Sequence, residues 1–367
     1  MQILVLGAGG FIGSHLVEHL VTRNEHQIVG LDLTREKLSG SLNHGFRFHE
    51  ADVRAVPELV DGLIREADLC VDLIAYANPS IYVTSPLEVF NLNFVQNLRV
   101  AEMCIRHGTR LIQYSSAEVY GKTIEGGAYN EETSDVIFGP VNKQRWIYAT
   151  AKLLLDRVLY AHGVAGNLDY TIVRPFNFIG PRIDYLVPPG SMGGPRVFAH
   201  FMSALLGQGP MYLVDGGNVH RAFLHIDDAC AAFQTLLDRP DESRNQIYNV
   251  GNPENNVTIR ELAYLMAGLY EELTGAPPQS PLVEVKGEEF YGAGYEDSDR
   301  LPPDISKMCA LGWTPKHDLE KTLRDAMSYY LEPGCEDRRQ VSLDPPLAQQ
   351  FSLELPLPRP LEAGLVI

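Results

Sequence analysis

The chain has 367 residues, of which 45% are hydrophobic and 21% charged, a composition typical of a globular protein with one large domain or two. Thirty Lys and Arg residues stand against 47 Asp and Glu residues, giving a net charge of -17. A field of this sign repels nucleic acid and anionic lipid, and no basic run offsets it locally. We therefore expect neither nucleic acid nor a membrane as a partner.

The sequence shows no sign of export or of a disulfide framework. Its N-terminal segment is apolar but lacks a basic leader and is broken by glycines, and no apolar run approaches the roughly 18 residues of a membrane span. The cysteines are scattered without a C-x-x-C pair, which favours buried thiols in a reducing compartment: Cys70, Cys104, Cys230, Cys309 and Cys335. We expect a cytoplasmic protein with no bound metal.

The first half of the chain alternates short apolar runs with amphipathic stretches. The apolar runs predict buried strands at 2–7, 27–32, 46–52, 69–77, 109–116 and 169–175. The amphipathic stretches predict helices at 12–23, 89–108 and 148–163. This alternation predicts an α/β fold with a Rossmann-type, doubly wound parallel sheet.

The pattern changes after Pro181, where loops rich in Gly and Pro separate shorter elements. We expect residues 1–180 to form the dinucleotide-binding domain, with chain returns to it around 220–250. Residues 181–332 are then mainly a smaller substrate-binding region, with amphipathic helices at 258–273 and 319–331. Residues 333–367 form a Pro-rich tail, which we expect to lie extended against the surface or a partner subunit.

The segment VLGAGGFIGSHL predicts a dinucleotide site between the first strand and the first helix. Gly7, Gly10 and Gly13 are spaced G-x-x-G-x-x-G, with Phe11 and Ile12 between the last two. The strict G-x-G-x-x-G pattern fails, because Ile12 stands where its last glycine would be. Small residues still let the backbone turn sharply and bring a pyrophosphate to the helix N-terminus.

Two aspartates extend this prediction to the rest of the dinucleotide. Asp32 ends the second predicted strand, where a carboxylate can accept hydrogen bonds from a ribose diol and repel the 2'-phosphate of NADP. NAD is therefore the expected cofactor, although nearby Arg35 leaves NADP open. Asp52 follows the third strand and is placed near the adenine.

A second constellation suits proton transfer. Tyr148 and Lys152 are four residues apart in a predicted helix, and therefore on one face. A nearby ammonium favours the phenolate, which can then take a proton from a hydroxyl, and Ser116 at the end of a predicted strand can complete a relay. Alone, the pair is more typical of a solvated helix face; the dinucleotide motif and the SSAEVYG segment at a strand end in the same chain favour catalysis.

These elements resemble the extended short-chain dehydrogenase/reductase family. The finer resemblance is to UDP-glucuronate decarboxylases, including the decarboxylase domain of the bifunctional polymyxin-resistance enzyme, and to plant UDP-apiose/UDP-xylose synthase. It extends to about Leu331 and depends on FGPVNKQRWIYATAK, TIVRPFNFIGPRID, GGPRVFAHF, NVGNPENNVTIRELA and FYGAGYEDSDR. It implies an NAD-dependent enzyme that acts on a UDP-sugar, with UDP-glucuronate favoured, and a homodimer formed through a helix pair.

The resemblance also implies roles for individual residues. Tyr148, paired with Ser116, would deprotonate the 4-hydroxyl of the sugar while C4 is oxidised, and Glu118 would work beside C4 and C5. A ketone at C4 makes a 6-carboxylate a β-keto acid, which loses CO2 readily. The implied substrate contacts are Arg145 for the sugar carboxylate, Asn177 and Arg196 for the nucleotide sugar, and Arg221 for the diphosphate.

The sequence departs from this pattern at three positions. Relatives carry Ser or Cys before the motif glutamate, where this chain has Ala117, a residue typical of 4-epimerases. Relatives also have an arginine two residues before the Pro-Asp pair, where this chain has Leu301; we expect Arg300 to take its place. Tyr212 replaces a lysine found in some relatives.

The first two departures weaken decarboxylation more than the initial C4 oxidation. A UDP-sugar 4-epimerase and a nucleotide-sugar dehydratase therefore remain alternatives, as does a non-catalytic NAD-binding module.

Overall fold

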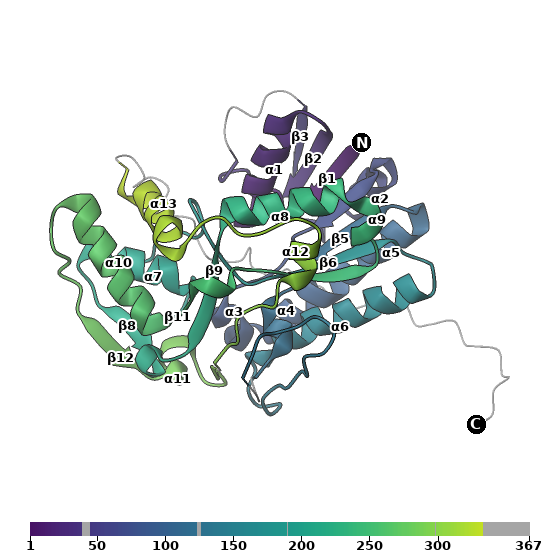
Figure 1. Ribbon diagram of the computed structural model, residues 1–367. Helices are drawn as coiled ribbons and strands as arrows, with labels where there is room; N and C mark the ends of the chain where they lie inside the picture. The colour runs from purple at the N-terminus through teal and green to yellow at the C-terminus, as the bar shows by residue number, and fades with distance from the viewer. Residues whose placement is uncertain (39–44, 123–125, 189, 298, 333–367) are drawn as a thin grey trace.

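The computed structural model describes residues 1–38, 45–122, 126–188, 190–297 and 299–332 (Figure 1). Its centre is a seven-stranded sheet in which every neighbouring pair is parallel, in the order β10-β6-β5-β4-β1-β2-β3. The strands are β1 Gln2–Leu6, β2 Gln27–Asp32, β3 Phe46–Glu50, β4 Leu69–Asp72, β5 Arg110–Tyr114, β6 Tyr170–Pro175 and β10 Gln246–Val250. The predicted doubly wound sheet is confirmed.

The apolar runs are continuous because helices cover both faces of the sheet. In β1, Ile3 and Val5 pack into one core and Leu4 and Leu6 into the other, as the two-residue period of a strand requires. The first core includes residues of α1 Phe11–Arg23 and α8 Ile226–Asp238. The second includes residues of α2 Pro57–Glu66, α5 Asn97–His107 and α6 Trp146–Val164.

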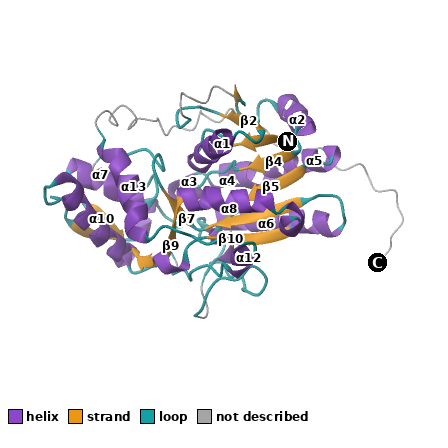
Figure 2. Cartoon of the chain, turned by 45° about the horizontal axis from the view of Figure 1, so that its top comes forward, coloured by secondary structure: helices purple, strands orange, loops and turns teal. Residues whose placement is uncertain are grey.

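A second group of elements lies beside the carboxyl ends of these strands, on the left in Figure 1. A three-stranded sheet contains β7 Asn177–Ile179, β9 His220–His225 and β11 Asn256–Thr258, and a two-stranded sheet contains β8 Met211–Val214 and β12 Leu282–Val285. Its helices are α7 Val197–Gly207, α10 Ile259–Thr274, α11 Gly287–Tyr291 and α13 Leu319–Leu331, seen from another side in Figure 2. Shorter helices are α3 Pro79–Thr84, α4 Pro86–Phe90, α9 Pro240–Ser243 and α12 Ser306–Ala310.

The predicted helix over 89–108 is interrupted in the structure. It consists of α4, a π-helical turn at Asn91–Gln96, and α5. Within the turn, the Asn93 side chain accepts a hydrogen bond from the Tyr76 amide at 2.8 Å and donates one to its carbonyl at 3.0 Å. This wider turn brings Asn93 to the loop after β4, where it satisfies the backbone groups of Tyr76.

The strand predicted at 69–77 ends at Asp72, the other predicted elements fall close to the expected positions, and the structure adds α2. Three cysteines are buried as expected, but Cys309 in α12 is exposed, so the prediction of buried thiols is wrong there. The tail and Cys335 lie outside the described residues. In the described part of the chain, no helix is both long and apolar enough to cross a membrane.

Candidate active site

The glycine-rich turn between β1 and α1 has the geometry of a phosphate cradle. Gly7 has a φ of +85°, which disfavours any side chain. A Cβ at Gly13 would lie 2.0 Å from the Gly7 carbonyl oxygen, so only glycine fits there. No side chain caps the N-terminus of α1, whose amides therefore remain available to an anion. The residues present thus fit a dinucleotide.

Asp32 stabilises this turn from the end of β2. Its carboxylate accepts hydrogen bonds from the amides of Gly9 at 2.8 Å and Leu33 at 2.6 Å, while burial raises its pKa. Asp52 follows β3 as expected and is held by Arg54 at 2.7 Å. The Arg35 guanidinium lies 5.9 Å from the centre of the Phe48 ring.

One cavity of about 380 Å³ runs from the glycine turn to the second group of elements. The predicted residues that line it are Gly7, Gly10, Phe11, Ile12, Gly13, Ser116, Glu118, Arg145, Tyr148, Lys152, Asn177, Arg196, Arg221 and Arg300. Asp32 and Asp52 lie outside this lining. At the far end, the ring of Tyr212 meets Phe290 edge to face at 5.6 Å. The structure therefore brings all but two of the predicted residues around one space.

Tyr148 and Lys152 project from α6 toward the end of β5. Burial raises the pKa of Tyr148 to about 12, and a hydrogen bond with Ser116 opposes this rise. The Tyr82 ring stacks on the Tyr148 ring at 4.5 Å. The Lys152 ammonium donates a hydrogen bond to the Tyr114 carbonyl at 2.8 Å. Lys152 is thus anchored to the sheet, and Tyr82 is a second phenol in the site that sequence reasoning missed.

Glu118 binds two buried arginines. It lies on the 3-10 helix Ala117–Tyr120 directly after β5, where the Ser116 hydroxyl accepts the Glu118 amide hydrogen bond at 3.1 Å. Its carboxylate is 2.8 Å from Arg145 and 2.6 Å from Arg300. Burial by itself raises the pKa of Glu118, but Arg145, Arg300 and Arg221 outweigh it and lower the value to about 2. Glu118 is therefore ionised at every working pH.

The loop that carries Arg300 is held by its own acidic residues. Glu296 accepts hydrogen bonds from Lys122 and from the Trp146 indole, each at 2.8 Å. Asp297 pairs with Arg221 at 2.6 Å, and Asp299 accepts the His220 amide at 2.7 Å. Glu296, Asp297 and Asp299 thus anchor this side of the site.

Leu301 and Arg300 lie in different surroundings. Leu301 packs against an apolar cluster that includes Ala117 and Phe176. Arg300 is 5% exposed, lines the cavity and pairs with Glu118. Its Nε and Nη1 have no hydrogen-bond partner among the described residues. Arg300, rather than Leu301, is therefore the residue of this loop that pairs with Glu118.

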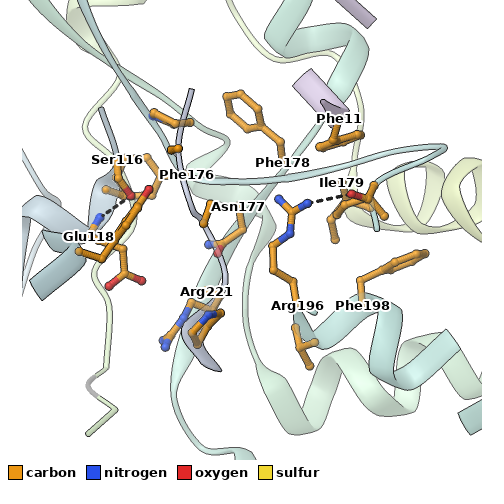
Figure 3. A pocket seen from close by; sticks show the side chains of 18 of the residues that line it. Phe11, Ser116, Glu118, Phe176, Asn177, Phe178, Ile179, Arg196, Phe198 and Arg221 are labelled. Atoms are coloured by element: carbon orange, nitrogen blue, oxygen red, sulfur yellow. Dashed lines mark hydrogen bonds between the residues drawn. The ribbon is translucent and has the colours of Figure 1, made fainter. Parts of the chain in front are cut away.

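Asn177 and Arg196 are already engaged by the protein. Asn177 donates to the Ala222 carbonyl at 3.0 Å. Arg196 is paired with Asp184 at 2.9 Å and lies 5.5 Å from the centre of the Phe11 ring. Figure 3 shows Ser116 and Glu118 at one side of the pocket, Arg196 near Phe11 at the other and Asn177 between them. Arg196 therefore lies closer to the glycine turn than to Glu118.

A histidine pair lies away from this cavity. His225 and His317 stack at 4.2 Å, and with Asp227 they place possible metal-ligand atoms within 4.8 Å of one another. The His225 Nδ1 accepts the Asp227 amide hydrogen bond at 3.0 Å and so caps α8. We assign the cluster to helix capping.

The sheet, the glycine turn and the Ser-Tyr-Lys constellation together define an NAD-dependent oxidoreductase-type fold of the extended short-chain class. Residues 3–251 match the NAD dependent epimerase/dehydratase family, and the chain belongs to this enzyme family, with NAD as its cofactor.

The relatives agree with the expected resemblance. The chain is 41% identical to UDP-D-apiose/UDP-D-xylose synthase 2 of Arabidopsis thaliana, covering 94% of this chain and 95% of the relative. It is 40% identical to the Oryza sativa subsp. japonica UDP-D-apiose/UDP-D-xylose synthase, covering 93% and 92%. The solved PbgP3 protein from Burkholderia pseudomallei is similar with a TM-score of 0.81 and 33% identity, covering 92% of this chain and 98% of that one.

Replacing Glu118 tests the buried ion pair. Because its folded pKa is about 2 against an ordinary 4.5, Glu118 adds stability that is present above pH 4.5 and lost as the pH falls toward 2. We expect Glu118→Gln to lower the free energy of unfolding by about 3 kcal/mol at pH 7, and by progressively less below pH 4. Urea unfolding at several pH values measures this difference.

Glu25→Gln is the matched control, because Glu25 pairs with Arg23 at the exposed surface. We expect it to change stability by less than about 1 kcal/mol. If Glu118→Gln lowers the free energy of unfolding by the same amount at pH 3 as at pH 7, Glu118 is not ionised in a buried ion pair.

Proposed function

We propose that the protein is an NAD-dependent UDP-glucuronate decarboxylase, giving a UDP-4-keto-pentose, UDP-xylose or UDP-apiose type product. The observation that carries this proposal is the charge around Arg300. Arg145 and Arg300 share the single carboxylate of Glu118, while Arg221 is paired with Asp297. The cluster of Glu118, Arg145 and Arg300 thus has a net charge of +1, which one substrate carboxylate would neutralise.

Unused donors in the cavity support this proposal. The Nε and Nη1 groups of Arg300 are buried without a hydrogen-bond partner in the described part of the chain, as is the Nε of Arg145. A buried arginine donor without an acceptor is costly, and a bound carboxylate would accept such bonds in pairs. The site therefore favours a sugar that carries an acid over a neutral sugar.

The glycine turn and Asp32 would hold NAD+, which supplies the hydride acceptor for oxidation at C4. Tyr148 would take the proton of the 4-hydroxyl, with Ser116 bonded to the same phenol. In the resulting β-keto acid, the C5–C6 bond breaks, its electron pair enters the C4 enolate, and CO2 leaves. Protonation of C5 gives the UDP-4-keto-pentose, and return of the hydride to C4 would give the UDP-xylose type product.

We propose a role for Glu118 other than the acid/base role expected beside C4 and C5. A carboxyl group with a pKa of about 2 carries no proton at neutral pH, so it is unsuited to act as an acid beside C5. We assign Glu118 to holding Arg145 and Arg300 in position for the substrate carboxylate.

A UDP-glucuronate 4-epimerase is the second candidate. The observation that favours it is Ala117, which lines the cavity beside Glu118 with a methyl group and offers no proton. An epimerase needs no donor at C5.

We expect wild-type protein with NAD+ and UDP-glucuronate to release CO2, with mass spectrometry showing a UDP-pentose lighter by that mass, or a UDP-4-keto-pentose lighter by that mass and two hydrogens. Tyr148→Phe lacks the phenolic base, so it should bind NAD+ but lose at least about a hundredfold in rate. An epimerised acid without CO2 release would favour the second candidate, and an unchanged substrate would refute both.

We further expect Arg300→Met to lower kcat/KM for UDP-glucuronate by about 10- to 100-fold, because charge-assisted hydrogen bonds to the carboxylate are lost. NAD+ binding should persist. Arg244→Met, which removes a half-exposed arginine paired with Asp169, is the control. If C4 oxidation of UDP-glucose, which has no carboxylate, falls by the same factor, Arg300 does not recognise the acid.

We also propose that two regions of the chain bind different ligands. Residues 1–180, with β10 returning to the main sheet, would hold NAD, and residues 181–332 would mainly hold the UDP-sugar. Arg196, beside Phe11, would contact the nucleotide sugar where the two regions meet.

A homodimer is proposed through α6 and α4. Exposed residues recur along one face of α6 at 150, 154, 157, 161 and 164, and they include Leu154 and Val164. Leu87 on neighbouring α4 is 74% exposed. A second copy would cover these side chains.

Sedimentation analysis tests this proposal. We expect wild type to be a dimer and the double variant Leu154→Glu, Val164→Glu to be a folded monomer, because each carboxylate would be buried in the interface. Tyr264→Glu, at an exposed position on α10, should stay dimeric. A monomeric wild type would overturn the proposal.

A further inference from the structure

One fully buried carboxylate has no part in the chemistry described so far. Asp72 ends β4 after three apolar residues and is 0% exposed. Its Oδ1 accepts the Ile74 amide hydrogen bond at 3.0 Å. Its Oδ2 has no hydrogen-bond partner among the described residues. Burying such a group is costly unless an opposite charge faces it.

The opposite charge is the ammonium of Lys152. Lys152 is 1% exposed and bonded to the Tyr114 carbonyl at the carboxyl end of β5. β5 is the neighbour of β4 in the sheet, and Asp72 is in register with Gln113, the residue before Tyr114. The two charges therefore lie at the same edge of adjacent strands.

The electrostatics of the two groups agree with this placement. Burial raises the pKa of Asp72 to about 6, and Lys152 is the strongest influence that opposes the rise. Burial lowers the pKa of Lys152, and Asp72 is the strongest influence that opposes the fall. Each group is thus the main electrostatic partner of the other.

A second carboxylate, Asp156 on α6, also acts on Lys152, but it is already paired with Arg174. Its Oδ2 accepts two hydrogen bonds from Arg174 on β6, at 3.2 and 3.1 Å. Arg174 also donates to the Tyr120 hydroxyl at 3.0 Å. Since Arg174 and Asp156 cancel, the charge that remains to balance Lys152 is that of Asp72.

We propose that Asp72 is the counter-ion of Lys152, a positioning residue that keeps this ammonium charged beside Tyr148. The inference rests on the catalytic role proposed for Lys152. Without Asp72, Lys152 is an unbalanced buried cation and gives up its proton at a lower pH.

Thermal unfolding of Asp72→Asn at several pH values tests whether Asp72 is ionised in the folded protein. Because the folded pKa of Asp72 is raised above its unfolded value, its favourable contribution is complete below about pH 4 and lost as the pH rises through 6. We expect Asp72→Asn to match the wild-type Tm at pH 4 and to exceed it by a few degrees at pH 8.

A double-mutant cycle tests whether Lys152 is the electrostatic partner of Asp72. In a Lys152→Met background, Asp72 loses its cation, so Asp72→Asn should raise Tm by more than it does alone. Equal increments in the two backgrounds would overturn the proposal. Asp68→Asn, an exposed position just before β4 whose carboxylate accepts the Gln2 amide, is the control and should show no coupling to Lys152.

The pH dependence of kcat/KM distinguishes a role through Lys152 from a purely structural role, which would leave it unchanged. For Asp72→Asn, we expect the alkaline limb of the kcat/KM profile to shift to lower pH by about one unit. A profile that superimposes on that of Asp68→Asn would refute a role through Lys152. Failure of the decarboxylase proposal would appear separately, as absence of CO2 from wild type, and would leave the stability cycle unaffected.

Discussion

The contact of Glu118 with Arg145 and Arg300 joins three parts of the chain that are separated in sequence. Glu118 follows the central strand β5, Arg145 immediately precedes α6, and Arg300 comes from the loop before α12. Arg145 and Arg300 are nearly inaccessible to water. Removing any one of the three partners therefore leaves an uncompensated charge buried in the protein interior, which is destabilising. This requirement fixes the start of α6, and with it Tyr148 and Lys152, against the end of the sheet.

The distribution of charge gives the cavity a sign opposite to that of the molecule. The chain carries -17 in total. Yet the described residues that line the cavity include five cationic side chains and only two carboxylates, Glu118 and Asp297. An anionic nucleotide sugar would therefore meet repulsion at the surface and attraction inside. Such a site selects by complementarity within the pocket and gains little from long-range steering.

Local features of the site could be predicted from sequence, whereas contacts between distant segments could not. The glycine turn and the Tyr148–Lys152 pair are set by short-range geometry, so their spacing predicted the local turn and the shared helix face. The orientation of Arg300 depends on where Leu301 packs, and that cluster includes residues far away in the chain. For that reason the sequence alone did not decide whether Arg300 takes the place of the arginine that relatives have at the position of Leu301.

Two other residues were missed because nothing near them in sequence signals a function. Tyr82 stacks on Tyr148 only because α3 lies against α6. Asp72 is a single acid in an apolar strand, and its partner is on a helix that begins more than seventy residues later. The acidic string at 296–299 was visible, but its partners Lys122, Trp146, Arg221 and His220 were not.

The distance in sequence between Glu118 and Arg300 has a consequence for folding. The strands up to β6 can pair as soon as the first half of the chain is available, but the ion pair closes only when the segment near residue 300 docks. Long-range closures of this kind are costly in chain entropy and form late. During synthesis, the sheet can therefore form while the catalytic end is still open, and a chain that stops before residue 300 would have a nucleotide fold without a finished active site.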